Sequence, residues 1–173
     1  MANKSLQECM EKGFFYGQNH SRLQEAIDAG YPINIQDKKG NTVFHKTKFS
    51  WPLFHYAIEK GFDTNLKNNK GDTVFHEKEF KLSDLKLAIK HGFDINSLNK
   101  KKLSIFHYRR GELDAEIIDF AIDNGFNINS VEPRRNFTIF HSGFDELFEK
   151  AIEKGFDFNV KDSVYGGTIF HGN

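Results

Sequence analysis

Cysteine is almost absent from this 173-residue chain, which contains only Cys9. A single thiol excludes a disulfide within the chain and any zinc site built from several cysteines, and it fits a reducing compartment. No apolar run approaches the roughly 20 residues that a membrane-spanning helix needs, and the polar start lacks a signal-peptide core. We therefore expect a cytoplasmic protein, or one exported into a host cell without a signal peptide.

Net charge is missing as well, because 24 Lys and Arg residues balance 24 Asp and Glu residues. Bulk charge therefore points to no class of partner. A hydrophobic fraction of 38% with 28% charged residues is typical of a folded protein and argues against wholesale disorder. The abundant residue is phenylalanine, with 19 copies, so an unusual share of the core must be aromatic.

One pattern recurs five times along the chain. An Ala-Ile pair is followed, four residues after the alanine, by glycine and an aromatic residue, and asparagine stands three residues beyond the aromatic. Each copy later has Thr or Ser, then Val or Ile, then Phe-His, and the histidines are spaced 31, 31, 34 and 30 residues apart at His45, His76, His107, His141 and His171. A near-constant period of this length is typical of stacked structural repeats.

Each copy also predicts its own local structure. An apolar residue three positions before the alanine completes one stripe of a helix, and the glycine stops that helix. Side-chain oxygens at the expected helix starts predict N-caps at Ser21, Ser50, Ser83 and Asp114. The polar stretch before each Phe-His predicts a turn, as a two-stranded finger with an exposed tip.

This organisation resembles the ankyrin repeat, through the helix-end glycine, the following asparagine, and a Thr-x-Phe-His similar to the family's Thr-Pro-Leu-His. The resemblance implies a mainly α, ankyrin-like solenoid of five units with short β-hairpin fingers, in one domain spanning 1–173. Residues 1–20 would form an N-terminal cap. The resemblance also implies that each histidine bonds backbone groups and ties one finger to the next.

The repeats depart from the family in length. From Phe-His to the next glycine there are 16, 16, 18 and 14 residues, where the family has about 18. We therefore expect the first helix of each unit to be shortened or irregular. The aromatic residue after each glycine would fill the space that this helix leaves.

No catalytic, cofactor-binding or metal site is predicted. Consecutive histidines in stacked repeats lie about 10 Å apart, too far to share a metal whose ligands stand near 2 Å. No phosphate-binding glycine loop and no Cys–His constellation is present. The sequence therefore predicts a protein that is not an enzyme and needs no cofactor.

The charge distribution favours a binding surface. Residues 1–115 carry 19 basic and 14 acidic side chains, whereas residues 116–173 carry 5 and 10. Basic residues cluster at the predicted finger tips and just after Phe-His, beside aromatic side chains that could anchor an interface. The predicted partner-binding residues are Lys38, Lys39, Lys70, Lys78, Phe80, Lys100, Lys101, Lys102, Tyr108, Arg109, Arg110, Arg134, Arg135 and Trp51.

Several functions remain open. The leading hypothesis is a monomeric, non-catalytic protein–protein interaction module that binds an acidic protein, refined by analogy to a bacterial or phage effector or a toxin-neutralising inhibitor. The alternative is a nucleic-acid-binding protein that uses the same basic tips, which the zero net charge disfavours. A third reading is that lysine-rich tips only keep the protein soluble.

Overall fold

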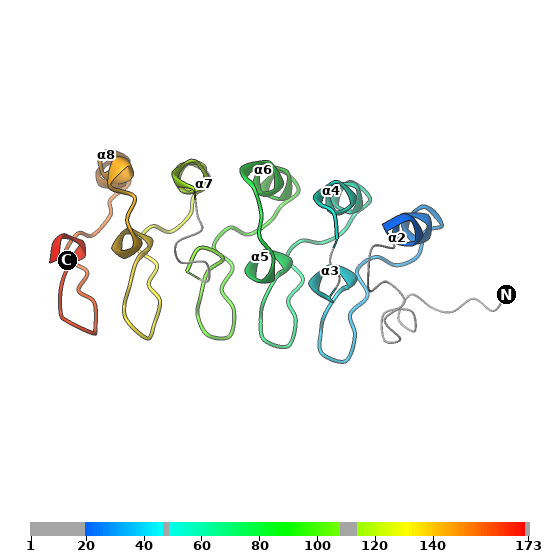
Figure 1. Cartoon of the computed structure of the whole chain (residues 1–173), viewed down its shortest axis with the longest axis horizontal. Coiled ribbons are helices and arrows are strands. Elements are labelled where there is room, and N and C mark those ends of the chain that lie inside the picture. Colours follow the sequence, from blue (N-terminus) through cyan, green and yellow to red (C-terminus); the bar gives the residue numbers. More distant parts are fainter. Residues whose placement is uncertain (1–19, 47–48, 108–113, 172–173) are drawn as a thin grey trace. The chain divides into compact units, whose positions relative to one another are not determined.

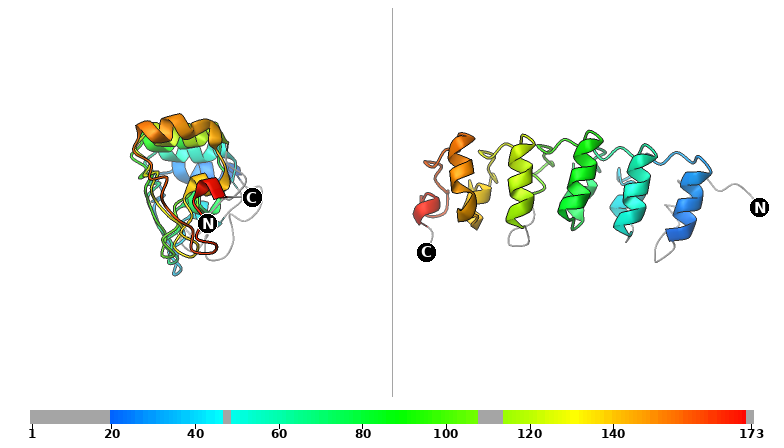
Figure 2. Two further views of the ribbon diagram at one scale, coloured as in Figure 1. Left: turned by 90° about the vertical axis from the view of Figure 1, so that its left-hand side faces the viewer. Right: turned by 90° about the horizontal axis from the view of Figure 1, so that it is seen from above.

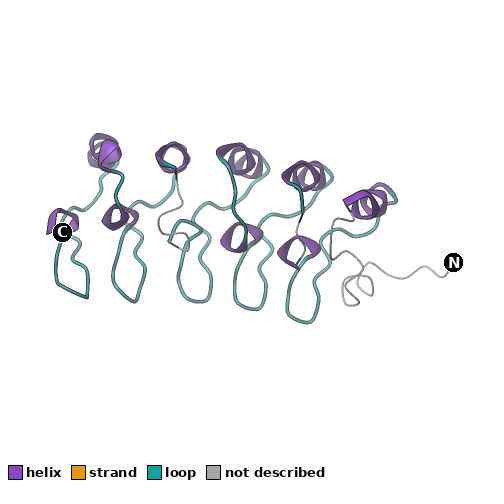
Figure 3. Ribbon diagram, in the orientation of Figure 1, coloured by secondary structure: helices purple, strands orange, loops and turns teal. Residues whose placement is uncertain are grey.

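The computed structural model describes residues 20–46, 49–107 and 114–171. Helices and loops make up these residues, and the only β pairing among them is an isolated antiparallel bridge between Glu132 and Phe137 (Figure 3). The predicted mainly α class is confirmed. The predicted fingers are present as loops closed at their base, and none of those described is a pair of strands.

The chain divides into two compact units, residues 1–93 and 94–173. In the first unit three nine-residue helices alternate with two four-residue helices: α2 (His20–Asp28), α3 (Val43–Lys46), α4 (Trp51–Glu59), α5 (Val74–Glu77) and α6 (Leu82–Lys90). The long helix α4 contacts both α2 and α6, and the short helices α3 and α5 contact each other (Figure 1). Neighbouring repeats therefore stack within this unit, with long helices in one layer and short helices in a second.

The second unit has the same two layers in a less regular form. Its elements are α7 (Ala115–Asp123), the 3-10 helices η1 (Ile139–Ser142) and η2 (Asp145–Leu147), α8 (Phe148–Glu153) and the 3-10 helix η3 (Ile169–His171). Residues 105–107, which correspond to α3 and α5, form only a turn. In the repeats where the residues after Phe-His are described without a gap, at His76 and His141, this segment begins with a short helix of four residues, as the shortened spacing predicts.

Each long helix ends at the glycine of the sequence pattern that recurs along the chain. Gly61 has a φ of +94°, which a residue with a side chain rarely adopts. Its N–H donates to the Ile58 carbonyl at 3.0 Å, and the Phe62 N–H donates to the Ala57 carbonyl at 2.9 Å. These two bonds define a Schellman motif. The pattern Ala-Ile-x-x-Gly-aromatic is therefore a helix ending that is repeated five times.

The structure clearly confirms only one of the predicted N-cap residues. Asp114 caps α7 by accepting the Glu116 N–H at 3.0 Å, as predicted. Ser50 precedes α4 but makes no side-chain cap, and a proline in the first turn removes one of the donors that would need it. The prediction is wrong for Ser83, which lies inside α6. There Asp84 accepts the Lys81 N–H at 2.7 Å.

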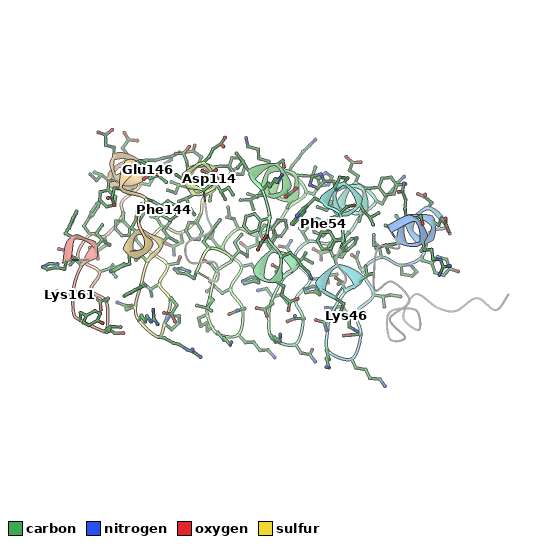
Figure 4. All side chains as sticks on the ribbon, viewed as in Figure 1. Lys46, Phe54, Asp114, Phe144, Glu146 and Lys161 are labelled. Carbon is green, nitrogen blue, oxygen red and sulfur yellow. The ribbon has the colours of Figure 1, made fainter. Side chains whose placement is uncertain are left out.

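The core is a set of phenylalanine contacts. Phe54 projects from α4 toward the short helices (Figure 4), and it is fully buried together with Phe44 and Phe75. In four repeats the phenylalanine before the histidine meets the phenylalanine after the next helix-end glycine, with ring centroids 4.6–4.8 Å apart: Phe44–Phe62, Phe75–Phe93, Phe106–Phe126 and Phe140–Phe156. The two phenylalanine columns of the sequence therefore meet in space, where a longer first helix would otherwise pack.

Truncating one member of such a pair should destabilise the protein. Phe93 is 5% exposed and contacts Phe75, so Phe93→Ala is expected to lower the free energy of unfolding by about 3–5 kcal/mol, as core phenylalanine truncations do. Urea denaturation followed by circular dichroism measures the change. Tyr165, which is 90% exposed, is the control, and Tyr165→Ala should change the value by less than about 0.5 kcal/mol. A near-zero effect of Phe93→Ala would show that the aromatic contact is dispensable.

Candidate binding surface

Two of the repeated histidines, His45 and His107, link one finger to the next. The Thr42 backbone N–H donates to Nδ1 of His45 at 3.2 Å, which leaves the ring proton on Nε2. That nitrogen bonds the Asp72 carbonyl of the next finger at 2.9 Å. In the second unit, Nε2 of His107 bonds the Ser130 carbonyl at 3.1 Å. The role that the family resemblance implies for these two histidines is confirmed.

Burial sets the protonation of His45. Removal from water lowers the pKa of this ring below its ordinary value, and the hydrogen bond to the Asp72 carbonyl only partly offsets that effect. A neutral imidazole is also what the geometry requires, since Nδ1 accepts a backbone N–H. His45 is therefore held neutral as part of the fold.

A polar side chain at the base of each finger fixes the loop. Asp37 accepts the N–H groups of Lys39 and Asn41 at 2.8 and 2.9 Å, and Asn68 accepts those of Lys70 and Asp72. Asn99, Glu132 and Asp162 make equivalent bonds in the later fingers. Burial by itself would raise the pKa of Asp37, but the hydrogen bonds from Lys46 and from these N–H groups outweigh it and lower the pKa. The finger loops are therefore held by fixed hydrogen bonds.

In the first unit the tips of two fingers are joined. The Asn69 N–H donates to the Lys39 carbonyl at 2.8 Å, and the Asn69 side-chain amide donates to the Lys38 carbonyl at 3.1 Å. The fingers approach so closely that a Cβ on Gly40 would lie 2.9 Å from the Asn69 nitrogen, so glycine is required there. The side chains at these tips are exposed lysines, which we call the tip patch: Lys38, Lys39, Lys67 and Lys70.

Two carboxylates near the tip patch are already engaged. Asp37 pairs with Lys46 at 2.8 Å, and Glu77 accepts a hydrogen bond from Asn68 at 3.0 Å. The nearest oxygen of Glu77 is 3.8 Å from Nζ of Lys70, a long contact for an ion pair at an exposed site. The tip patch therefore keeps a positive field.

The second unit carries the remaining predicted basic tips. Lys100, Lys101 and Lys102 are exposed on one finger, and Arg134 and Arg135 are exposed on the next. The backbone of these two arginines accepts hydrogen bonds from Ser163 of the last finger, at 3.1 and 2.8 Å. As in the first unit, adjacent tips are locked together by backbone contacts while the charged side chains stay in solvent.

The predicted aromatic anchors do not belong to this surface. Phe80 is 7% exposed and packs edge-on against Phe75 at 5.3 Å, so its prediction as a partner-binding residue is wrong. Trp51 is only partly exposed, and its ring contacts Phe49, Phe54 and Phe75. Sequence proximity to lysines does not show which way a ring turns, and Phe80 turns into the core; the prediction for Trp51 stays a prediction. Tyr108, Arg109 and Arg110 lie outside the described residues.

Lys78 also differs from its prediction. It is half-buried, and the loss of hydration lowers the pKa of its amine despite the neighbouring Glu77 carboxylate. A partly desolvated lysine offers less to a partner than an exposed one. We therefore confine the candidate surface to the finger tips.

The asparagine three residues after each aromatic has a role that the sequence alone did not predict. The Asn34 side chain donates to the Gly61 carbonyl at 3.0 Å and accepts the Asp63 N–H at 2.8 Å. Asn96 and Asn129 make the same pair of bonds in the second unit. The asparagine amide carries its donor and its acceptor on separate atoms, so one side chain can bond a carbonyl and an N–H together. The recurrence of asparagine three residues after each aromatic was the signal.

Among the described residues no three His, Cys, Asp or Glu side chains are grouped so that they could hold a metal ion. No described helix is long and apolar enough to cross a membrane. Comparison of the sequence with protein-family models finds no match, and comparison with the curated proteins finds none either.

The lowered pKa of His45 predicts that stability falls in mild acid. Above an unfolded-state pKa of about 6.5 both states are neutral, but below it the unfolded ring binds a proton that the folded ring does not, so the free energy of unfolding decreases by at most about 1.4 kcal/mol per pH unit. Urea midpoints between pH 7.5 and 5.5 measure this dependence. It should shrink in His45→Gln and persist in the control His91→Gln, whose ring is exposed. Equal dependence in His45→Gln and the parent protein would contradict the assignment.

Proposed function

We propose that the protein is a non-catalytic protein–protein interaction module that binds an acidic surface of a protein partner through its finger tips. The observation that carries this proposal is the tip patch, in which four exposed lysines stand on two loops joined by hydrogen bonds from the backbone and side chain of Asn69. The resemblance to ankyrin repeats supports it by analogy, and an effector or a toxin-neutralising inhibitor would be a specific form of such a module.

Rigid loops make the tips suitable for binding. Ordering a flexible loop on association costs free energy, whereas a loop held by its own hydrogen bonds has already met that cost. Lysines are depleted at the desolvated centres of interfaces, so the tip patch would act chiefly by steering an acidic partner and fixing its orientation. Its contribution should therefore appear in the association rate and weaken with salt.

The same lysines could meet phosphates of a nucleic acid. Proteins that bind nucleic acid through many phosphate contacts lose affinity steeply with salt. The tip patch offers four lysines in one unit, and the whole chain has no net positive charge. The experiment on the proposed function therefore also tests whether the tip patch binds nucleic acid.

Reversing the tip patch should weaken partner binding. The test variant carries Lys38→Glu, Lys39→Glu, Lys67→Glu and Lys70→Glu. The matched control carries the same change at four other exposed lysines of the same unit, Lys60, Lys81, Lys86 and Lys90. Affinity capture from the source organism should recover a partner with the parent protein and the control, and lose it at least tenfold with the test variant.

Nuclease treatment and a 20-base-pair duplex separate the two classes of partner. A protein partner should survive nuclease, and the duplex should bind only at low salt. Capture of the same partner by the test variant as by the parent protein would refute the proposal. Loss of the partner on nuclease treatment would favour the nucleic-acid alternative.

A further inference from the structure

The fourth and fifth fingers, in the second unit, carry side chains unlike those of the tip patch. Arg134 and Arg135 stand on the fourth finger, and Val164 and Tyr165 stand on the fifth. Both fingers project away from α7 and α8 (Figure 2). All four side chains are exposed, Tyr165 to 90% and Val164 to 50%. Because these residues share two joined tips, we call them the arginine–tyrosine patch.

The loops that carry this patch are longer than the earlier fingers. At their bases, the N–H groups of Glu132 and Asp162 each donate to a carbonyl five residues further on, at 2.8 Å. In the three earlier fingers the same bond spans four residues, as from Asn68 to Asp72 at 2.9 Å. Each of the last two loops therefore presents one more residue at its tip than an earlier finger does.

Hydrogen bonds fix the backbone beneath the arginine–tyrosine patch. The Glu132 carboxylate accepts the N–H groups of both arginines, at 2.9 and 3.1 Å. The Asp162 carboxylate accepts those of the valine and the tyrosine, at 2.8 and 2.6 Å. Ser163 joins the two loops through the arginine carbonyls. Since the backbone is already ordered, a partner would meet these side chains at a reduced entropic cost.

Exposure at a finger tip does not depend on whether another finger follows. The Lys39 carbonyl accepts a bond from Asn69 of the next finger, and the arginine carbonyls accept bonds from Ser163, yet all three side chains stay exposed. By the same geometry, a finger beside the fifth would bond backbone carbonyls and leave Val164 and Tyr165 in solvent. The arginine–tyrosine patch therefore belongs to the edge of the fingers and not to the end of the stack.

The two guanidinium groups are open to a carboxylate. The Arg135 guanidinium lies over the Phe137 ring, 6.0 Å from its centroid, and that ring stacks on His141 at 5.0 Å. This contact uses the face of the guanidinium and leaves its N–H edge accessible. Within the part of the chain that the structure describes, neither Arg134 nor Arg135 forms an ion pair. A guanidinium edge matches the two oxygens of a carboxylate.

We propose that the arginine–tyrosine patch binds an acidic segment of a protein partner in which an apolar side chain stands beside the carboxylates. The carboxylates pair with Arg134 and Arg135, and the apolar side chain packs against Tyr165 and Val164. Arginine and tyrosine are enriched among the residues that dominate the energy of interfaces, whereas lysine is depleted. The inference shares with the proposed function the use of finger tips, and it adds a second site in the other unit whose partner chemistry includes an apolar group.

The composition of the patch favours a protein segment over a nucleic acid. Proteins that bind single strands combine a groove of cations along the backbone with several stacking rings. The patch has two cations and one exposed ring, and residues 116–173 carry 5 basic and 10 acidic side chains. A polyanion would meet this excess of negative charge, whereas a short segment with one or two carboxylates needs only the patch itself.

A selection from random peptides provides a defined probe. The full chain is immobilised and offered a phage-displayed library of random peptides in the presence of an excess of a soluble decoy. The decoy carries Arg134→Glu, Arg135→Glu, Val164→Ser and Tyr165→Ser, so it removes peptides that bind anywhere else, including the tip patch. The enriched peptides should share an acidic residue close to a leucine, isoleucine, phenylalanine or tryptophan.

Charge reversal tests the two arginines. One enriched peptide is labelled with fluorescein, and its binding to the full chain is measured by fluorescence anisotropy. Arg134→Glu with Arg135→Glu should weaken binding at least tenfold, because each carboxylate would meet a like charge. Lys90→Glu with Lys154→Glu makes the same change of charge at two exposed lysines outside the fingers, and it should change binding less than twofold.

The aromatic contact is tested with the same peptide. Tyr165→Ser should weaken binding at least tenfold, whereas Leu98→Ser, at another exposed apolar residue, should not. Because Tyr165 is 90% exposed, its variant should keep the parent melting curve, which circular dichroism checks. The variant with the four reversed lysines of the tip patch should bind the peptide as the parent chain does, so failure of the tip patch and failure of this proposal are separate results.

Four results would overturn the proposal. The first is that no peptide is enriched against the decoy, and the second is that the enriched peptides lack acidic residues. The third is equal binding of the peptide to the parent chain and to the chain with both arginines reversed. The fourth is displacement of the peptide by single-stranded oligodeoxythymidine at a lower concentration than by the unlabelled peptide, which would assign the patch to nucleic acid.

Discussion

Four of the repeats depend on one contact, between the phenylalanine before the histidine and the phenylalanine after the next helix-end glycine. The spacing after Phe-His is too short for a regular first helix in most repeats, so another group must fill the volume beneath the long helix. The two rings do so in four repeats, at centroid separations of 4.6–4.8 Å. Because protein interiors tolerate few voids, this pairing fixes the distance between the long helix and the short turn.

Around this aromatic core, side chains bond backbone groups of the fingers and of the long-helix endings. His45 and His107 reach the carbonyl groups of the next finger, and Asn34, Asn96 and Asn129 clamp the next helix ending. Buried polar groups are stable only when hydrogen-bonded, so these side chains are constrained in identity as well as in place. Fingers built this way are rigid, and their tips can hold charged side chains in fixed positions.

Side chains at fixed positions of the repeat also set the contacts between consecutive long helices. Within the second unit, Asp119 and Asp123 of α7 hold Lys150, and Asn129, which follows α7, bonds the ending of α8. On α8 the positions that correspond to the two aspartates are Glu149 and Glu153.

The sequence by itself determined the mainly α class, the five helix endings at glycine, the cap at Asp114 and the short turns after Phe-His, because each follows from local stereochemistry at a fixed spacing. It also pointed, through the family resemblance, to the bonds of His45 and His107. Only the tertiary structure decided that the fingers are loops without strands, that Phe80 turns into the core and that Asp84 rather than Ser83 caps α6. It alone showed that Ile152 and Phe170 are exposed although their columns are buried elsewhere. The reason is physical: ring direction, burial and exposure depend on which neighbour packs against a residue, and identical residues in a repeat differ only in that neighbour.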